Sequence, residues 1–137
     1  MKLPGKLVDA NVVLRFFIED DEEQFVRAKA FIQRLELGND EALVPDIVFA
    51  EVVWVLNKVY DVPRPEITEK FSKLLGYKGV KTLFSKELYL ESLQLYARQS
   101  IDIQDILLAV IARDRDCTVI TFDNADFKKL NCKYSGP

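Results

Sequence analysis

Residues 117–123 read Cys-Thr-Val-Ile-Thr-Phe-Asp, the clearest strand signal in the chain, because four of the first five residues are β-branched. The stretch ends on an acid, Asp123, and lies between two segments of helical character. Residues 102–115 have an almost continuous apolar centre, and residues 123–130 follow as a short helix. A strand framed in this way predicts an α/β architecture, in which strands and helices alternate.

The same alternation extends toward the N-terminus. Short apolar runs at residues 6–8, 42–44 and 81–84 predict three more strands. Apolar side chains at helical spacing predict helices over residues 11–17, 22–37, 45–60, 66–77 and 85–99. The prediction is a single domain over residues 1–137, an α/β fold with a mainly parallel central sheet flanked by helices. In such sheets, ligands bind beyond the carboxyl ends of the strands.

The composition excludes several mechanisms and environments. The chain contains no histidine, which removes serine–histidine triads, histidine bases and histidine-held zinc. The cysteines, Cys117 and Cys132, lack metal-finger spacing and favour a reducing compartment. No apolar run approaches the roughly 20 residues that span a bilayer. The first residues carry charge where a signal peptide needs an apolar stretch, so we expect a cytoplasmic protein without membrane contact.

Three acids lie at a strand end or at a helix start, where an α/β fold gathers its functional residues. Asp9 ends the first predicted strand, Asp105 lies in the first turn of a helix, and Asp123 ends the stretch quoted above. Each has an alternative explanation as a helix cap, and Asp102 and Asp126 are placed to share that task. The repetition of acids at equivalent places is the argument for a common site.

Glu51 lies within an apolar helical segment. Its neighbours three and four residues away on a helix are all apolar: Ile47, Val48, Trp54 and Val55. Burial of an unpaired carboxylate among such side chains is costly, or forces the carboxylate to take up a proton. We therefore expect a metal ion or a basic side chain beside Glu51.

A cluster of these four acids requires cations. Neighbouring carboxylates about 4 Å apart repel by about 1 kcal/mol in water and by about 4 kcal/mol at a partly buried site. Ligand sets made of oxygen alone select Mg²⁺ or Mn²⁺ over zinc or copper. The net charge of −3 argues only weakly against a nucleic-acid partner, because the four acids contribute −4 and the rest of the chain carries +1.

These residues together resemble the acidic constellation of PIN-domain nucleases. The resemblance runs from about residue 7 to residue 127, and it rests on Asp9-x-Asn11, Glu51, Asp105-Ile106-Leu107-Leu108-Ala109 and Thr121-Phe122-Asp123. It implies that Asp9, Glu51, Asp105 and Asp123 are catalytic metal ligands, supported by Asn11, Asp102 and Thr121. Asp126 remains an alternative to Asp123 as the fourth acid. Ile106 departs from the family pattern, which usually has a small residue there.

The resemblance also implies the chemistry and the partners. One or two Mg²⁺ or Mn²⁺ ions would support in-line hydrolysis of RNA, leaving a 5′-phosphate and a 3′-hydroxyl. Asp9 and Asp105 would be the principal ligands, completed by Asp123, and Glu51 would bind a second ion or orient the water. The length is similar to that of VapC-type toxins of VapBC toxin–antitoxin pairs, so a VapB-like antitoxin and a homodimer are expected. The candidates for RNA contact are Arg15, Arg113, Arg115, Lys128 and Lys129.

Other classes of protein also gather acids at strand ends. A PIN-like fold without catalysis could serve as a binding module or scaffold, and this alternative stays open. A response-regulator phosphoacceptor domain would need paired acids after its first strand and a lysine after a late strand, which residues 9–11 and 121–123 lack. A haloacid-dehalogenase phosphatase would need a second aspartate where the chain has Asn11.

Overall fold

Helices dominate the fold, and several begin at a side chain that caps them. Helix α2 (Glu22–Leu37) follows Asp21, whose Oδ1 accepts a hydrogen bond from the Gln24 backbone N–H at 3.0 Å. It ends at Gly38, where φ is 77°, a left-handed conformation that favours glycine. Both ends match the bounds predicted from the sequence, because the chain supplies a capping residue at each end of the helix.

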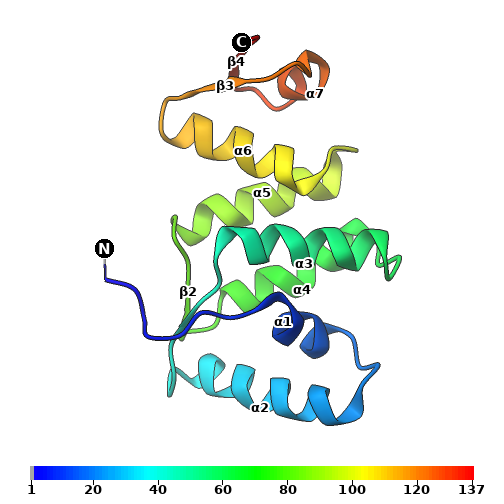
Figure 1. Ribbon diagram of the computed structural model, residues 1–137, viewed down its shortest axis with the longest axis vertical. Helices are drawn as coiled ribbons and strands as arrows, with labels where there is room; N and C mark the ends of the chain where they lie inside the picture. The colour runs from blue at the N-terminus through cyan, green and yellow to red at the C-terminus, as the bar shows by residue number, and fades with distance from the viewer. Residues whose placement is uncertain (1) are drawn as a thin grey trace. The chain divides into compact units, whose positions relative to one another are not determined.

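The structure is a computed structural model that describes residues 2–137, and the chain forms two compact units, Met1–Leu83 and Phe84–Pro137 (Figure 1). The other elements of unit 1 are α1 (Ala10–Phe17), β1 (Ala42–Leu43), α3 (Asp46–Lys58), α4 (Arg64–Leu75) and β2 (Val80–Lys81). Those of unit 2 are α5 (Lys86–Arg98), α6 (Ile103–Asp114), β3 (Thr118–Ile120), α7 (Asn124–Lys129) and β4 (Lys133–Ser135). Every predicted helix is present within two residues of its predicted ends. Within residues 2–137, no helix has both the length and the hydropathy of a membrane span.

The strand pairs between described residues are all parallel, which confirms the α/β fold class. In unit 1, β1 pairs with β2, and Ala42 lies opposite Val80. In unit 2, β3 pairs with β4, and Val119 lies opposite Tyr134. Each unit therefore has a small parallel sheet with helices packed against it.

Strand bounds depart from the prediction more than helix bounds do. The predicted first strand is a single parallel bridge between Leu7 and Leu43, beside which the Val8 N–H donates to the Leu43 carbonyl at 2.9 Å. The strand predicted over residues 81–84 is instead β2. Strand β4 was not predicted, because its sequence Lys-Tyr-Ser has no β-branched residue and no alternating apolar pattern.

The core of unit 1 joins α1, α3 and α4. Helix α3 packs against both of the others, and its Val52 and Val53 are completely buried. Phe71 of α4 is also completely buried and meets Phe17 and Phe49 edge-on, at ring-centroid distances of 5.7 and 4.8 Å. Edge-to-face contacts add to the hydrophobic gain of burying the rings of Phe49 and Phe71. This cluster fixes α1, and with it Asp9, against α3.

The core of unit 2 is built on α6. Helix α5 packs along α6 and buries Tyr89, Leu93 and Tyr96, while α6 contributes Ile103 and Ile106. The other side of α6 packs against β3 and α7. The first turn of α6 is therefore held in a fixed relation to the start of α7.

Gly79 lies where two backbone segments approach closely in unit 1. Its N–H donates to the Leu35 carbonyl at 2.7 Å, and its carbonyl accepts from the Ala42 N–H at 2.9 Å. A Cβ atom at residue 79 would lie 2.0 Å from the carbonyl oxygen of Asp40. Only glycine fits this approach, which sets the start of β2 beside β1.

Candidate metal centre

Three carboxylates of unit 2 lie together. Asp105, Asp123 and Asp126 each offer an oxygen, and these oxygens all lie within 4.8 Å of one another. Asp105 and Asp126 are half-buried, and Asp123 is exposed. From the sequence, Asp126 is an alternative to Asp123 as the fourth acid. The structure places both of them beside Asp105.

The elements of unit 2 position this acidic cluster. Asp105 lies in the first turn of α6. Asp123 is the N-cap of α7, where its Oδ1 accepts from the Asp126 N–H at 3.3 Å. The Thr121 hydroxyl oxygen in turn accepts from the Asp123 N–H at 2.9 Å. The capping interpretation of Asp123 is thus confirmed, and the cap also directs the chain so that Asp126 joins the cluster.

Negative charge accumulates around Asp105. The pKa of Asp105 is raised above its ordinary 3.8, first because burial removes its carboxylate from water. The charges of Asp126, Asp102 and Asp123 raise it further, in that order. Asp102 is the N-cap residue of α6, but its side chain makes no capping hydrogen bond to the helix within the described chain. The cluster therefore disfavours its own ionised state unless a cation joins it.

The raised pKa of Asp105 predicts a pH-dependent stability in the absence of metal. Because the folded state holds this proton more tightly than the unfolded chain, its stabilising contribution is full below pH 3.8 and is lost as pH rises through the raised pKa. Asp105→Asn should therefore gain stability relative to wild type as pH rises through the raised pKa. Urea unfolding in EDTA across this range measures the difference. Parallel pH curves for the two proteins would contradict the prediction.

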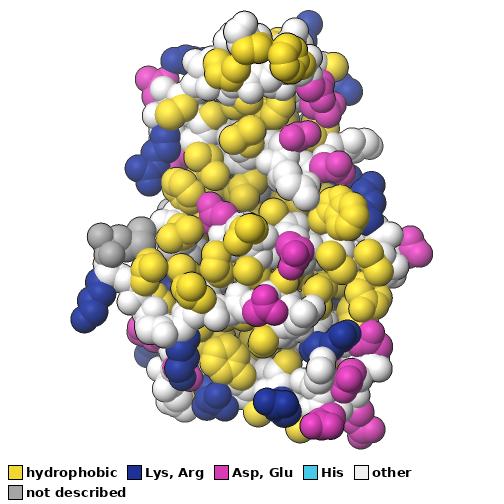
Figure 2. All heavy atoms as spheres, in the orientation of Figure 1, with side chains coloured by type: hydrophobic (Ala, Val, Ile, Leu, Met, Phe, Trp, Pro, Cys, Tyr) yellow, Lys and Arg dark blue, Asp and Glu magenta, His cyan; other side chains and the backbone are white. Residues whose placement is uncertain are grey.

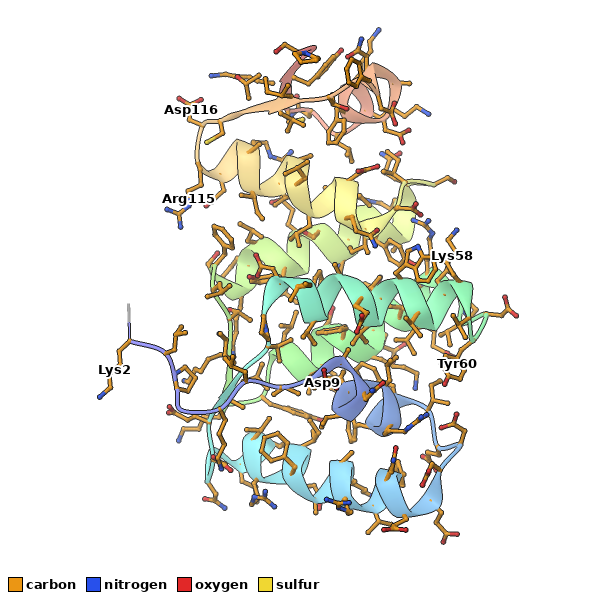
Figure 3. All side chains as sticks on the ribbon, in the orientation of Figure 1. Lys2, Asp9, Lys58, Tyr60, Arg115 and Asp116 are labelled. Atoms are coloured by element: carbon orange, nitrogen blue, oxygen red, sulfur yellow. The ribbon has the colours of Figure 1, made fainter. Side chains whose placement is uncertain are left out.

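In unit 1, Asp9 lies at the start of α1 (Figure 3). It is the N-cap residue, and its Oδ2 accepts from the Asn11 N–H at 3.3 Å. The side chain is exposed, so one of its oxygens caps the helix while the other stays accessible. Asn11, two residues farther along in α1, is likewise exposed.

Glu51 differs from its predicted environment. Its helical neighbours are apolar, but the face they form is open: Ile47 is 79% exposed, Trp54 is 41% exposed, and Glu51 itself is exposed. Figure 2 shows that apolar side chains with acids among them reach the surface. The expected cost of burying an unpaired Glu51 therefore does not arise, because helical spacing identifies neighbours but not whether another element covers them.

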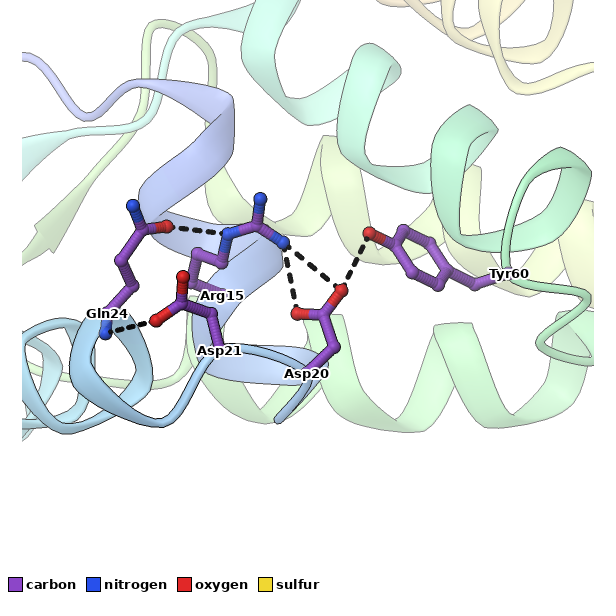
Figure 4. A network of polar contacts seen from close by, with 5 residues as sticks. All are labelled: Arg15, Asp20, Asp21, Gln24 and Tyr60. Carbon is purple, nitrogen blue, oxygen red and sulfur yellow. Dashed lines mark hydrogen bonds and ion pairs between the residues drawn. The ribbon is translucent and has the colours of Figure 1, made fainter.

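The basic candidates for RNA contact differ in how many polar contacts they make within the protein. Arg15 donates from Nε to Gln24 at 2.7 Å and pairs with Asp20 at 3.0 Å, and the Tyr60 hydroxyl donates to the same Asp20 at 3.3 Å (Figure 4). This network ties α1 to the start of α2 and to the end of α3. Asp21, the cap of α2, completes it through the Gln24 backbone.

In unit 2, the remaining candidates are exposed. Arg113 is hydrogen-bonded to Glu91 of α5. Arg115 lies over the ring of Phe84, 5.2 Å from its centroid. Lys128 and Lys129 lie in the last turn of α7, where they also complement the helix dipole. All four are thus accessible to an anionic ligand.

The acidic cluster fits a hard divalent cation. Its donors are carboxylate oxygens, which Mg²⁺ and Mn²⁺ prefer. Two oxygens on one Mg²⁺ ion, each at about 2.1 Å, lie at most about 4.2 Å apart. The oxygens of the acidic cluster lie within 4.8 Å of one another, slightly wider than that limit, so a shared ion would draw the carboxylates a little closer together. A cation would also relieve the repulsion that raises the pKa of Asp105.

The chain is similar to known proteins over nearly its whole length. A family model described as PIN domain matches residues 6–131. A protein of Aquifex aeolicus (strain VF5), named VapC ribonuclease, is 28% identical over 135 residues, which cover 96% of this chain and 96% of that protein. The PIN domain match covers most of both units and includes Asp9, Glu51, Asp105, Asp123 and Asp126.

Proposed function

The chain belongs to the PIN domain family, and on this basis we propose that it is a metal-dependent endoribonuclease that hydrolyses phosphodiester bonds of RNA. The observation that carries the proposal is the acidic cluster of unit 2, whose oxygens lie within 4.8 Å of one another. The similarity of the chain to a VapC ribonuclease over nearly its whole length supports the same activity.

In this proposal, the catalytic metal ligands are Asp9, Glu51, Asp105 and Asp123. Asp9 and Asp105 are the principal ligands, Asp123 completes the set, and Glu51 holds a second ion or orients the attacking water. Asp126 lies close enough to Asp105 and Asp123 to join them. Bound Mg²⁺ or Mn²⁺ would supply a water of lowered pKa and would offset charge on the scissile phosphate.

Three further residues support these ligands. Thr121 accepts from the Asp123 N–H and fixes the turn that presents Asp123. Asp102 adds negative charge beside Asp105, which strengthens the attraction for a cation. The Asn11 N–H restrains one oxygen of Asp9. In-line attack of water on phosphorus would leave a 5′-phosphate and a 3′-hydroxyl.

The proposal requires residues 1–137 to act as a single PIN-like domain. The quartet takes Asp9 and Glu51 from unit 1 and the other two acids from unit 2. The PIN domain match over residues 6–131 extends across most of both units and supports this requirement.

We further propose that the enzyme is the toxin of a toxin–antitoxin pair that acts in the cytoplasm. The name of the Aquifex aeolicus relative supports this role. A VapB-like antitoxin would then be its inhibitor, and a homodimer its functional form. An open reading frame for a small DNA-binding protein beside the gene would support the assignment.

Cleavage of total RNA by the purified chain tests the enzymatic proposal. We expect fragments with 5′-phosphate ends in Mg²⁺ or Mn²⁺ and none in EDTA. Asp9→Asn should lose this cleavage, because asparagine removes the charge that holds a cation while keeping a side-chain oxygen for the helix cap. Circular dichroism checks that the variant remains folded.

A matched variant controls for contaminating nucleases. Glu23→Gln, at an exposed acid in the first turn of α2, should cleave like wild type after the same purification. Cleavage by Asp9→Asn at the wild-type rate would contradict the assignment of Asp9. A folded wild-type protein that binds RNA but never cleaves it with metal would favour the binding-module alternative.

A further inference from the structure

An open groove of about 850 Å³ lies within unit 1, between the N-terminal segment, α1 and α2. Asp9 and Asn11 line it, so it adjoins one of the acids of the proposed site. Helix α2 contributes Arg27, Phe31 and Arg34, which recur at intervals of four and three residues and so share one helical face. The groove is thus formed by the packing of two helices.

The groove concentrates positive charge in an acidic protein. Its lining includes one carboxylate, that of Asp9, and four cations: Lys6, Arg15, Arg27 and Arg34. The lining therefore carries a net +3, whereas the chain carries −3. A groove of one sign attracts ligands of the opposite sign and raises their local concentration.

Three of the cations are held in place by nearby acids or amides. Lys6 Nζ and Arg34 Nε lie 2.6 and 3.8 Å from the same Oδ2 of Asp40, and the Lys6 hydrogen bond lowers the pKa of Asp40. Arg15 is fixed by Gln24 and by its ion pair described above. These cations are preorganised, although part of their charge is already balanced.

Arg27 has no such partner. Its side chain is exposed, and it makes no hydrogen bond or ion pair with any residue from 2 to 137. Four residues on, Phe31 is half-buried, and the guanidinium carbon of Arg34 lies 5.3 Å from its ring centroid. The groove thus offers an uncompensated cation and an aromatic ring, the combination that binds phosphate and base in single-stranded nucleic acids.

We propose that this groove binds a single-stranded segment of the RNA substrate and leads it to Asp9. Arg27 contacts a backbone phosphate, and Phe31 stacks on a base. This inference rests on the proposed function, because it leads the RNA strand to Asp9, an acid that the proposed nuclease would use. An acidic peptide would also be attracted to the cations, but it would gain less from the flat ring of Phe31 and has no need to reach Asp9.

Equilibrium binding without metal tests the groove separately from catalysis. The probe is a fluorescein-labelled single-stranded RNA dodecamer of mixed sequence, titrated by anisotropy in EDTA at several salt concentrations. Arg27→Gln should weaken binding about tenfold and reduce the slope of log K against log salt by about 0.7, the value for one lost phosphate contact on a single strand. Phe31→Ala should weaken binding about fivefold or more and leave the slope unchanged, since it removes stacking but no charge.

Lys29→Gln is the matched control. Lys29 is an exposed cation two residues from Arg27 on the same helix, but it does not line the groove. This variant should bind RNA like wild type, and circular dichroism compares the folding of all three variants. Equal losses of RNA affinity in Lys29→Gln and Arg27→Gln would show that the effect comes from net charge alone, and would overturn the proposal.

Two further outcomes are decisive. RNA binding by Arg27→Gln with the affinity and salt slope of wild type would overturn the proposal, whatever the nuclease assay shows. A deca-glutamate peptide that competes with RNA at similar affinity, and loses its own binding in Arg27→Gln, would assign the groove to an acidic protein partner instead. Groove-dependent RNA binding without metal-dependent cleavage would end the proposed activity but leave the groove as an RNA site.

Discussion

Asp105→Asn is expected to lower metal-dependent RNA cleavage at least about a thousandfold. Asp105 is one of the two half-buried members of the acidic cluster, and the charges of Asp126, Asp102 and Asp123 all raise its pKa. Loss of its charge removes a principal ligand, and several kcal/mol of transition-state stabilisation from a metal correspond to about a thousandfold in rate. Initial cleavage rates in Mn²⁺, with isothermal calorimetry of Mn²⁺ uptake, measure the effect.

Asp114→Asn is the control on the same helix. Asp114 lies at the end of α6, where it is exposed and 3.3 Å from Arg115, away from the first turn that holds Asp105. This variant should cleave RNA and take up Mn²⁺ like wild type. If Asp105→Asn retained wild-type cleavage while folded, the acidic cluster of unit 2 would have no role in the chemistry.

Phe71→Ala is expected to reduce the free energy of unfolding by about 3–5 kcal/mol. Phe71 is completely buried, and its ring contacts both Phe17 and Phe49. Its truncation removes a large apolar surface from the core and leaves a cavity among three helices that cannot readily collapse. Urea unfolding followed by tryptophan fluorescence measures the change, because the single Trp54 lies in α3 of the same unit.

Phe122→Ala makes the same chemical change where it should cost little. Phe122 is 91% exposed, so its removal should alter stability by less than about 0.5 kcal/mol. A single transition, seen at the same urea concentration by fluorescence and by circular dichroism, would also support the single-domain proposal. Equal destabilisation by the two substitutions would contradict the aromatic core of unit 1.

The helices could be predicted closely because their signals are local. Asp21 and Gly38 bracket α2 with a cap and a left-handed stop, and both operate within a few residues of the helix ends. Strands have no such signals. The bounds of β2 depend on its pairing with β1, in which Leu43 lies opposite Lys81, and this contact between distant residues leaves no mark on the sequence around Lys81.

The candidate site could be predicted in part for the same reason. Asp105 and Asp123 stand at a helix start and after a strand, positions that the pattern identifies, and α6 packs against α7 so that they meet. Asp126 joins the acidic cluster because Asp123, itself held by the Thr121 hydroxyl, caps α7 through the Asp126 N–H, and this backbone geometry is not visible in the sequence pattern. For Glu51, helical spacing identified the neighbours but not their exposure, because exposure depends on tertiary packing.

The close approach at Gly79 limits which amino acids the chain can accept at this position. The nearest backbone oxygen, that of Asp40, lies only 2.0 Å from the position of a Cβ atom, so even alanine would force apart the two segments that align β1 with β2. Gly5, in contrast, has no heavy atom of residues 2–137 within 4 Å of its Cβ position apart from its own and those of its chain neighbours. In a redesigned chain, residue 5 can therefore be replaced by a residue with a side chain, whereas residue 79 must remain glycine.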